Sequence, residues 1–183
     1  MELESTFIDG VYLLKRQPKG DDRGFFERLF CKTALANIFT QQSVYQINHS
    51  HTKESGTVRG LHFQYPPYAE KKIIYCIRGS VFDVVVDLRK GSPTFLSYYA
   101  HVLSDENYCS MLVPEGVAHG FQTLTSDCEM LYLHTADYNH QAEGGVNALD
   151  PTINIKWPQK ITIRSKRDEE RPMLSKNFYG IEL

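Results

Sequence analysis

Short apolar segments separated by turn-forming residues fill the middle of the chain. Residues 72–77 (KIIYCI) and 81–88 (VFDVVVDL) flank a turn at Arg78-Gly79-Ser80. Further strands are predicted at 94–102, 110–114, 118–124 and 129–134. Runs of about four to eight residues rich in β-branched and aromatic side chains are typical of β-strands. Their regular spacing favours a jelly roll or a barrel, so the sequence predicts an all-β fold.

Helical signals are sparse beside these strands. A short helix is predicted over residues 33–40, and residues 154–183 are expected to form an irregular segment laid over the barrel. The 183 residues contain no internal repeat, low-complexity tract or linker. This length fits one domain that spans residues 1–183. A domain of this size buries enough surface to fold without a metal or a disulfide.

Composition and charge argue against several classes of function. The formal net charge is −2, so the chain lacks the basic surplus with which proteins bind the phosphate backbone of nucleic acids. Its apolar runs are too short to cross a bilayer, so we expect no membrane association. The four cysteines show no paired spacing, and the acidic N-terminus shows no secretion signal. Both features indicate a cytoplasmic protein with reduced thiols.

Two short motifs carry the strongest chemical signal. They are GTVRGLHFQ at residues 56–64 and PEGVAHGF at residues 114–121. Together they resemble the two motifs of the cupin barrels, which in metal-binding members supply three histidines and a glutamate. The resemblance implies a cupin-type jelly-roll β-barrel with short helical and irregular terminal segments.

The cupin metal ligands are only partly present. His62 and His119 stand at two ligand positions, whereas Gln64 and Lys72 take the places of the second histidine and the glutamate. A protonated lysine has no lone pair to offer and repels a divalent cation. We therefore expect neither a metal nor another cofactor. A positive side chain in that place suits a reaction in which negative charge develops on an oxygen.

A longer series of motifs resembles one family of these barrels, the dTDP-4-dehydrorhamnose 3,5-epimerases. The series is DRGFFE, QINHS, RGLHFQ followed by Lys72, AHGF and SKRD, and the resemblance runs from about Phe7 to Leu174. It implies a metal-independent isomerase that epimerises C3 and C5 beside the C4 ketone of a dTDP-4-keto-6-deoxyhexose in rhamnose-type deoxysugar biosynthesis. It also implies a small nucleotide-sugar substrate and a homodimer.

The hydrogens beside a ketone can be removed because the resulting carbanion is an enolate. A base takes the proton on one face, an acid returns one on the other, and a positive group stabilises the oxyanion. The resemblance implies His62 as the base, held by Asp168. It further implies Tyr132 as the acid and Lys72 as the oxyanion stabiliser. The neighbouring Lys71 should point to the opposite face of the strand.

The resemblance also implies a set of substrate-binding residues. Arg23 and Arg59 are candidates for the diphosphate, because guanidinium groups pair bidentately with phosphate oxygens. The candidates for contacts with the nucleotide or the sugar are Phe25, Glu27, Gln46, Asn48, His119 and Tyr138. Since dimers of the family exchange strands, some of these residues are expected to serve the partner's site. A structural role for His119 is an open alternative, and Asp83 is expected near the His62–Asp168 pair, behind the residues that contact the substrate.

Several features leave other interpretations open. His49 and His51, with Glu54, form a generic metal-like cluster, which we interpret as part of an exposed polar loop. Asp137 replaces one tyrosine of a pair common in the family, which leaves open an epimerase for C3 alone, for C5 alone or for a heptose. A metal-dependent cupin enzyme and a non-catalytic sugar-binding barrel are the alternatives from other classes.

Overall fold

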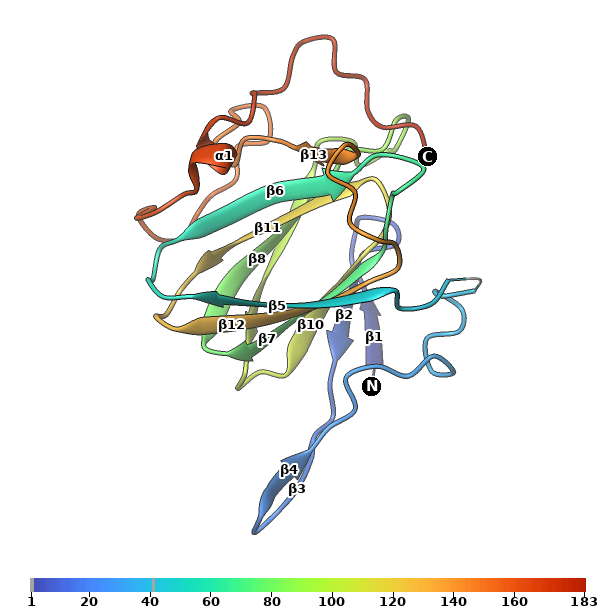
Figure 1. The fold of residues 1–183 in the computed structure, drawn as a ribbon, viewed down its shortest axis with the longest axis vertical. Helices are drawn as coiled ribbons and strands as arrows, with labels where there is room; N and C mark the ends of the chain where they lie inside the picture. Colours follow the sequence, from blue (N-terminus) through green and yellow to red (C-terminus); the bar gives the residue numbers. More distant parts are fainter. Residues whose placement is uncertain (1, 41) are drawn as a thin grey trace.

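The fold consists of two facing antiparallel β-sheets, and the computed structural model describes residues 2–40 and 42–183 (Figure 1). In order across the sheet, the larger one contains β1 (Glu2–Ser5), β2 (Tyr12–Lys15), β10 (Cys109–Val113), β7 (Lys72–Arg78), β12 (Cys128–His134) and β5 (Gln46–Thr52). The smaller one contains β13 (Glu143–Gly145), β6 (Val58–Gln64), β11 (Val117–Thr123), β8 (Ser80–Asp87) and β9 (Tyr98–Ser104). The remaining elements are the hairpin β3 (Lys19–Asp21) and β4 (Gly24–Phe26), and the helix α1 (Lys166–Glu169).

Apolar side chains fill three layers around these sheets. Val85 of β8 belongs to the core between the sheets, whereas the adjacent Val84 packs on the outer face of the smaller sheet with Ile181 of the C-terminal segment. Leu35 and Phe39 cover the outer face of the larger sheet. Because their two faces are both buried, the central strands appear in the sequence as continuous apolar runs rather than as alternating patterns.

The predicted all-β class is confirmed, and the strands expected around 72–77, 81–88, 110–114, 118–124 and 129–134 correspond to β7, β8, β10, β11 and β12. The strand expected at 94–102 begins only at Tyr98. Residues 94–97 form a turn, in which the N–H of Ser97 donates to the carbonyl of Thr94 over 2.9 Å. The hydroxyl of Thr94 donates to Asp87, which anchors this turn to the end of β8.

The helix predicted over residues 33–40 is wrong. The N–H of Ala36 bonds to the carbonyl three residues earlier, whereas the N–H of Phe39 bonds to the carbonyl four residues earlier. This mixture gives successive turns that do not propagate as an α-helix. Packing of Leu35 and Phe39 against the larger sheet holds the segment in place.

Residues 154–183 form the predicted irregular segment over the smaller sheet. Trp157 and Phe178 pack on its outer face, and Ile181 pairs with Arg89 in an isolated bridge. The short helix α1 lies within this segment, in agreement with the short terminal helices that the resemblance implies, although the sequence did not predict its position. In the described parts of the chain, no helix has the length and the apolar character needed to span a membrane.

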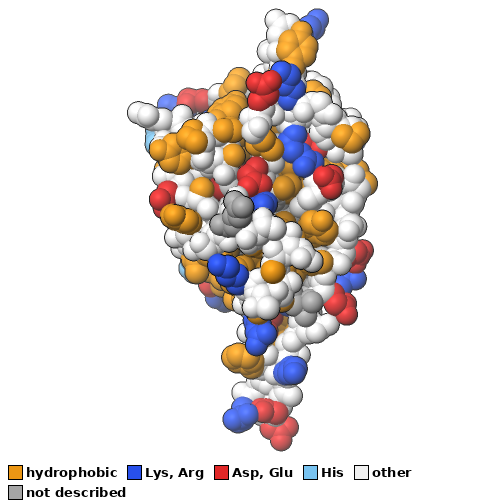
Figure 2. All heavy atoms as spheres, turned by 90° about the vertical axis from the view of Figure 1, so that its right-hand side faces the viewer, with side chains coloured by type: hydrophobic (Ala, Val, Ile, Leu, Met, Phe, Trp, Pro, Cys, Tyr) orange, Lys and Arg blue, Asp and Glu red, His pale blue; other side chains and the backbone are white. Residues whose placement is uncertain are grey.

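The hairpin β3–β4 projects away from the barrel. Figures 1 and 2 show it standing clear of the body of the molecule, with charged side chains at its tip. All of residues 19–26 are exposed, including Phe25 and Phe26. At its base, Arg16 Nη1 donates to Glu27 Oε1 over 2.6 Å in a buried ion pair. This pair fixes the hairpin to the larger sheet.

Candidate active site

A cavity of about 630 Å³ lies between the two sheets. It is lined by these residues predicted to act on the substrate: Asn48, Arg59, His62, Lys72, His119, Tyr132 and Asp168. A smaller cavity of about 150 Å³ shares His62 and Lys72 with it and is also lined by Gln46 and Tyr138. The fold therefore gathers most of the predicted site in one place.

The alternation of strand side chains explains why these residues meet. Neighbouring residues of a strand point to opposite faces, so every second residue of the barrel strands faces the interior. His62 of β6 stands opposite His119 of β11 in the smaller sheet. Tyr132 of β12 stands opposite Asn48 of β5 in the larger sheet. The proposed base and the proposed acid thus project from opposite walls of the cavity.

His62 and Asp168 form the predicted pair although they are far apart in the sequence. His62 Nε2 lies 2.6 Å from Asp168 Oδ1. The Asp168 side chain is almost fully buried, whereas that of His62 is 29% exposed. Because a carboxylate accepts the Nε2–H of the imidazole, Nδ1 is left as the ring nitrogen that can take up a proton. The arrangement is that of an imidazole oriented by a carboxylate.

Helix α1 holds Asp168 beside the barrel. Ser165 caps the helix, and its Oγ accepts a bond from the N–H of Asp168 over 3.1 Å. Arg164 Nη2 donates to the carbonyl of Asp168 over 2.6 Å. Burial acts to raise the pKa of the Asp168 carboxyl. The hydrogen bond and charge of His62, with the N–H of Gly60 and the side chain of Ser165, outweigh burial and hold that pKa below its usual range. The carboxylate is therefore ionised where it meets His62.

The glycines of the two motifs let β6 and β11 approach closely. A Cβ at Gly60 would lie 2.6 Å from the Cα of Gly120, and a Cβ at Gly120 would lie 2.6 Å from the carbonyl oxygen of Arg59. Gly120 directly follows His119, which stands opposite His62. A side chain here would force the two strands apart and move both histidines.

We expect Gly120→Ala to lower the free energy of unfolding by about 1–3 kcal/mol, the usual cost of overpacking a core. Urea denaturation measures this change, and any catalytic activity of the cavity should fall with it because the histidines shift. Gly20→Ala, on the exposed hairpin, is the matched control and should leave the unfolding midpoint nearly unchanged. Equal effects of the two substitutions would contradict the close approach of β6 and β11.

Tyr132 presents a protonated phenol to the cavity. Its hydroxyl lies 3.2 Å from Ser50 Oγ, and its ring packs edge-on against the ring of His119. Burial raises the pKa of Tyr132 well above its usual range, which keeps the proton on the oxygen. Sequence reasoning missed Ser50. The signal was available, because Ser50 follows Asn48 by two residues and so shares its face of the strand.

Lys72 is fixed by two residues that sequence reasoning also missed. Lys72 Nζ lies 3.1 Å from Glu70 Oε1, and Glu70 Oε2 accepts a bond from His134 Nδ1 over 2.9 Å. Lys71 points the other way, as predicted, and its Nζ donates to Gln42 Oε1 over 2.7 Å. Glu70 and His134 could have been found in the same way as Ser50. Glu70 lies two residues before Lys72 and His134 lies two residues after Tyr132, and residues two apart on an extended chain point to the same side.

His119 has a buried partner of its own. Its Nε2 lies 2.7 Å from Asp83 Oδ2, and Asp83 is fully buried. Burial raises the pKa of the Asp83 carboxyl, although the charge and hydrogen bond of His119 partly oppose this effect. Asp83 was expected near the His62–Asp168 pair, and its partner His119 stands opposite His62 in the strand register. Asp83 faces inward from β8, next to β11, and so meets His119.

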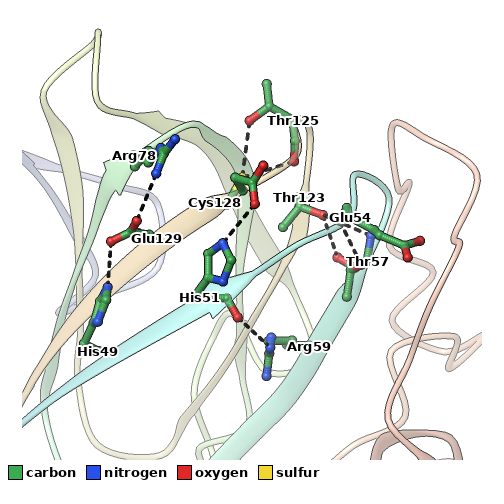
Figure 3. A network of polar contacts seen from close by, with 11 residues as sticks. His49, His51, Glu54, Thr57, Arg59, Arg78, Thr123, Thr125, Cys128 and Glu129 are labelled. Carbon is green, nitrogen blue, oxygen red and sulfur yellow. Dashed lines mark hydrogen bonds and ion pairs between the residues drawn. The ribbon is translucent and has the colours of Figure 1, made fainter.

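The suggested metal-like cluster of His49, His51 and Glu54 does not form, because each histidine pairs with a different acidic residue. His49 and His51 lie on β5 rather than in a loop, which corrects the prediction. His49 Nε2 lies 3.0 Å from Glu129, and His51 Nε2 lies 3.1 Å from Asp127 (Figure 3). Glu54 instead accepts bonds at its backbone carbonyl, so the three residues do not converge. Within the described residues, no group of three potential ligands is placed to hold a metal ion.

Arg59 lies at the edge of the cavity and is held by the end of β5. Its Nε donates to Thr52 Oγ1 over 3.0 Å. Its Nη2 donates to the carbonyl of His51 over 3.2 Å, as Figure 3 shows. Arg167 lines both cavities and pairs with Glu143, which also accepts a bond from the Tyr138 hydroxyl. Arg167 is a further cation that the sequence did not single out.

Three predicted substrate-binding residues lie outside this chain's own cavity. Arg23 is at the tip of the projecting hairpin and pairs with Asp21, and Phe25 follows it on β4. Glu27 is engaged by Arg16 at the base of the hairpin. Strands β3 and β4 pair with each other and not with either sheet, so the contribution of these three residues to substrate binding stays a prediction.

Comparisons with known proteins place the chain in a family. The family model for dTDP-4-dehydrorhamnose 3,5-epimerase matches residues 5–176. A relative of that name from Sinorhizobium fredii is 39% identical over 175 residues, which make up 95% of this chain and 90% of the relative.

Solved structures agree over the whole barrel. The crystal structure of dTDP-4-dehydrorhamnose 3,5-epimerase from Bacillus anthracis, with TDP and PPi bound, matches with a TM-score of 0.90 and 39% identity over 94% of this chain and 99% of that one. That of dTDP-6-deoxy-D-glucose-3,5-epimerase from Legionella pneumophila, in complex with dTDP-4-keto-L-rhamnose, matches with a TM-score of 0.91 and 30% identity over 100% and 98%. The predicted cupin-type jelly roll is confirmed, and the chain belongs to the dTDP-4-dehydrorhamnose 3,5-epimerase family.

Proposed function

We propose that this protein is an isomerase that inverts C3 and C5 of a dTDP-4-keto-6-deoxyhexose in deoxysugar biosynthesis. The observation that carries the proposal is the 2.6 Å contact between His62 Nε2 and Asp168 Oδ1 at the wall of a cavity, facing Tyr132 on the opposite sheet. A sugar ring held between the sheets then meets a base on one face and an acid on the other. Binding of a sugar alone needs no base and acid on opposite faces of the ring.

The proposed reaction moves one proton at a time. His62 Nδ1 takes the proton from C3, and the electron pair of the C–H bond passes into the C4 carbonyl to give an enolate. The Lys72 ammonium stabilises the oxygen anion, an effect typically worth about 3–4 kcal/mol for one preorganised donor. The Tyr132 hydroxyl delivers a proton to the opposite face of C3. Solvent restores both side chains, and the same steps at C5 complete the inversion.

The donor set suits this metal-independent chemistry. Lys72 and Gln64 occupy the positions of two cupin metal ligands, and Gln64 is engaged by backbone groups, because its Nε2 donates to the carbonyls of Tyr68 and Asp137. Its Oε1 accepts the N–H of Asn139 over 2.7 Å. An ammonium and an amide with its hydrogen bonds already made are poor ligands for a divalent ion. We therefore propose that no metal takes part.

The direct test of the function is exchange in D₂O. The protein is incubated with dTDP-4-keto-6-deoxyglucose, and deuterium at C3 and C5 is followed by NMR. We expect deuterium at both carbons together with the inverted product. Deuterium at one carbon only would assign the chain to a single-centre epimerase with the same chemistry. Absence of exchange at both carbons, with other nucleotide bases tested in parallel, would overturn the proposal.

We propose further that the protein works as a homodimer in which the hairpin β3–β4 reaches the partner's cavity. The projecting position of the hairpin, the exposure of Phe25 and Phe26, and the buried Arg16–Glu27 pair at its base support this arrangement. Arg23 would then bring a guanidinium to the diphosphate bound in the other subunit.

Mixed dimers test this arrangement. Arg23→Ala and His62→Ala homodimers should each lose most of their activity. When the two variants are unfolded, mixed in equal amounts and refolded, we expect roughly a quarter of wild-type activity. Half of the random dimers are mixed, and each mixed dimer holds one complete site. A mixture as inactive as its components would show that Arg23 serves its own chain, and a monomer in light scattering would exclude the dimer.

A further inference from the structure

Glu70 is a buried carboxylate that the proposed reaction has not yet used. Its side chain is only 6% exposed, and its two oxygens have different partners. Oε1 lies 3.1 Å from Lys72 Nζ, and Oε2 accepts a bond from His134 Nδ1 over 2.9 Å. Burial acts to raise the pKa of Glu70, but His134 and Lys72 outweigh this effect and hold the pKa below its usual range. The Glu70 carboxylate is therefore ionised, and each of its oxygens faces a different hydrogen-bond donor.

The direction of every hydrogen bond around it follows from one fixed donor. The backbone N–H of Tyr138 can only donate, and it bonds to Gln46 Oε1 over 3.1 Å. Gln46 must therefore turn its Nε2 toward Asn48 Oδ1, 3.0 Å away. Asn48 in turn presents its Nδ2 to His134 Nε2 over 3.3 Å. His134 accepts at Nε2, so its ring is neutral and its proton is on Nδ1, facing Glu70.

These residues form a row across the inner face of the larger sheet. In the strand registers, His134 of β12 stands opposite Gln46 of β5 on one side and opposite Lys72 of β7 on the other. His134 also lines both cavities. A continuous series of hydrogen bonds, which ends in the ion pair of Glu70 with Lys72, therefore connects the amides proposed to face the nucleotide with the ammonium proposed to face the ketone.

We propose that Glu70 and His134 are positioning residues, which hold the Lys72 ammonium charged and aimed at the C4 oxygen. This inference rests on the proposed epimerase function. An ammonium in a largely buried site is stable only with a counter-charge. The ionisable side chains that line the smaller cavity with Lys72 are His62, Glu70, His134, Tyr138, Glu143 and Arg167. Glu143 is already paired with Arg167 and Arg171, so Glu70 supplies the negative charge for Lys72.

An amide cannot replace the Glu70 carboxylate. In the variant Glu70→Gln, the new amide accepts from Lys72 through its oxygen, so its NH₂ group faces Nδ1 of His134. Two donors cannot face each other, so the ring proton of His134 must move from Nδ1 to Nε2. That proton then meets the Asn48 NH₂ group and forces Asn48 and Gln46 to turn over. Gln46 Nε2 would finally face the backbone N–H of Tyr138, which cannot change. The conflict has no resolution within the row, so Lys72 or the amides must move.

Kinetics and one spectroscopic measurement test the proposal. With dTDP-4-keto-6-deoxyglucose, we expect Glu70→Gln to lower kcat by about ten- to a hundredfold with little change in KM, because the lost interaction is made in the transition state. The alkaline decline of kcat should begin at lower pH than in the wild type, because an unpaired ammonium loses its proton more readily. His134→Ala should act in the same direction, and His134→Asn, which keeps a donor near the position of Nδ1, should recover part of the rate.

Coupling between the two residues gives a sharper criterion. Because both act through one series of bonds, the double variant Glu70→Gln/His134→Ala should lose little more than Glu70→Gln alone. Glu115→Gln is the matched control, since Glu115 pairs with Lys71 on the other face and should leave kcat and its pH profile unchanged. Additive losses, or single variants with the wild-type kcat and alkaline decline, would overturn the proposal.

Nitrogen-15 NMR of the His134 ring gives a test that needs no turnover. In the wild type near neutral pH we expect the neutral ring with its proton on Nδ1. A proton on Nε2, or an imidazolium, would refute the hydrogen-bond series even if the enzyme were active. The wild type could show the His134 proton on Nδ1 and yet fail to turn over dTDP-4-keto-6-deoxyglucose. That result would refute the epimerase proposal and support the hydrogen-bond series from Gln46 to Glu70.

Discussion

His62→Ala is expected to abolish exchange of the C3 and C5 hydrogens with solvent while leaving nucleotide binding nearly intact. Loss of a positioned general base typically costs about 10²–10⁴ in rate. Asp168 cannot take over, because its carboxylate is buried behind the imidazole and tied to helix α1. Deuterium incorporation measures the first effect, and titration with TDP measures the second.

The control is a variant that keeps Asp168 paired. His62→Ala leaves a buried carboxylate without its partner, which by itself could disturb α1. His62→Gln retains an amide donor for Asp168 Oδ1 but has no basic nitrogen. We therefore expect it to unfold near the wild-type temperature and still to show no exchange. Near-normal exchange in either variant would assign the base to another residue.

The sequence was sufficient for the parts of the site that rest on local spacing. His62, His119 and Lys72 could be placed because the barrel motifs and strand alternation determine which way they point. The pairing of Asp168 with His62 could be predicted only from the family resemblance. Asp168 stands in a charged run, and its burial depends on a helix of four residues that no periodic pattern announces.

Strand β5 shows why a polar segment was misread as a loop. One face of β5 lines a polar cavity through Asn48 and Ser50, and the other carries His49 and His51 to the surface. Neither face is apolar, so the alternation that usually identifies a half-buried strand is absent. Glu70 and His134 could have been placed on the cavity face by their spacing of two from Lys72 and Tyr132, but the spacing does not show that the two residues bond to each other.

For the hairpin β3–β4, the sequence indicates which residues are functional but not which subunit's cavity they enter. Its motif identifies Arg23 and Phe25 as functional through the resemblance, but neither a motif nor a single chain determines whose cavity they enter. Phe25 packs edge-on against Tyr108 of its own chain, whereas Phe26 is 76% exposed. Exposed aromatic side chains on a projecting hairpin are typical of a surface that another chain covers.

Tyr132→Phe is expected to separate proton removal from inversion. The enolate still forms when His62 takes the C3 proton, and His62 returns a proton to the same face. In D₂O the substrate should therefore gain deuterium with its original configuration, while formation of the inverted sugar falls by about 10²–10⁴, the usual contribution of a general acid. NMR of the same sample reports the deuterium content and the configuration at each carbon.

Two variants separate the role of the phenol from its packing. Ser50→Ala removes the partner 3.2 Å from the hydroxyl but keeps the proton donor, so inversion should fall less than in Tyr132→Phe. Tyr99→Phe, which alters a tyrosine packed against the core outside the cavity, should leave both rates unchanged. If Tyr132→Phe slows exchange and inversion equally, the phenol acts before the enolate forms, and the acid must be sought elsewhere on the wall opposite His62.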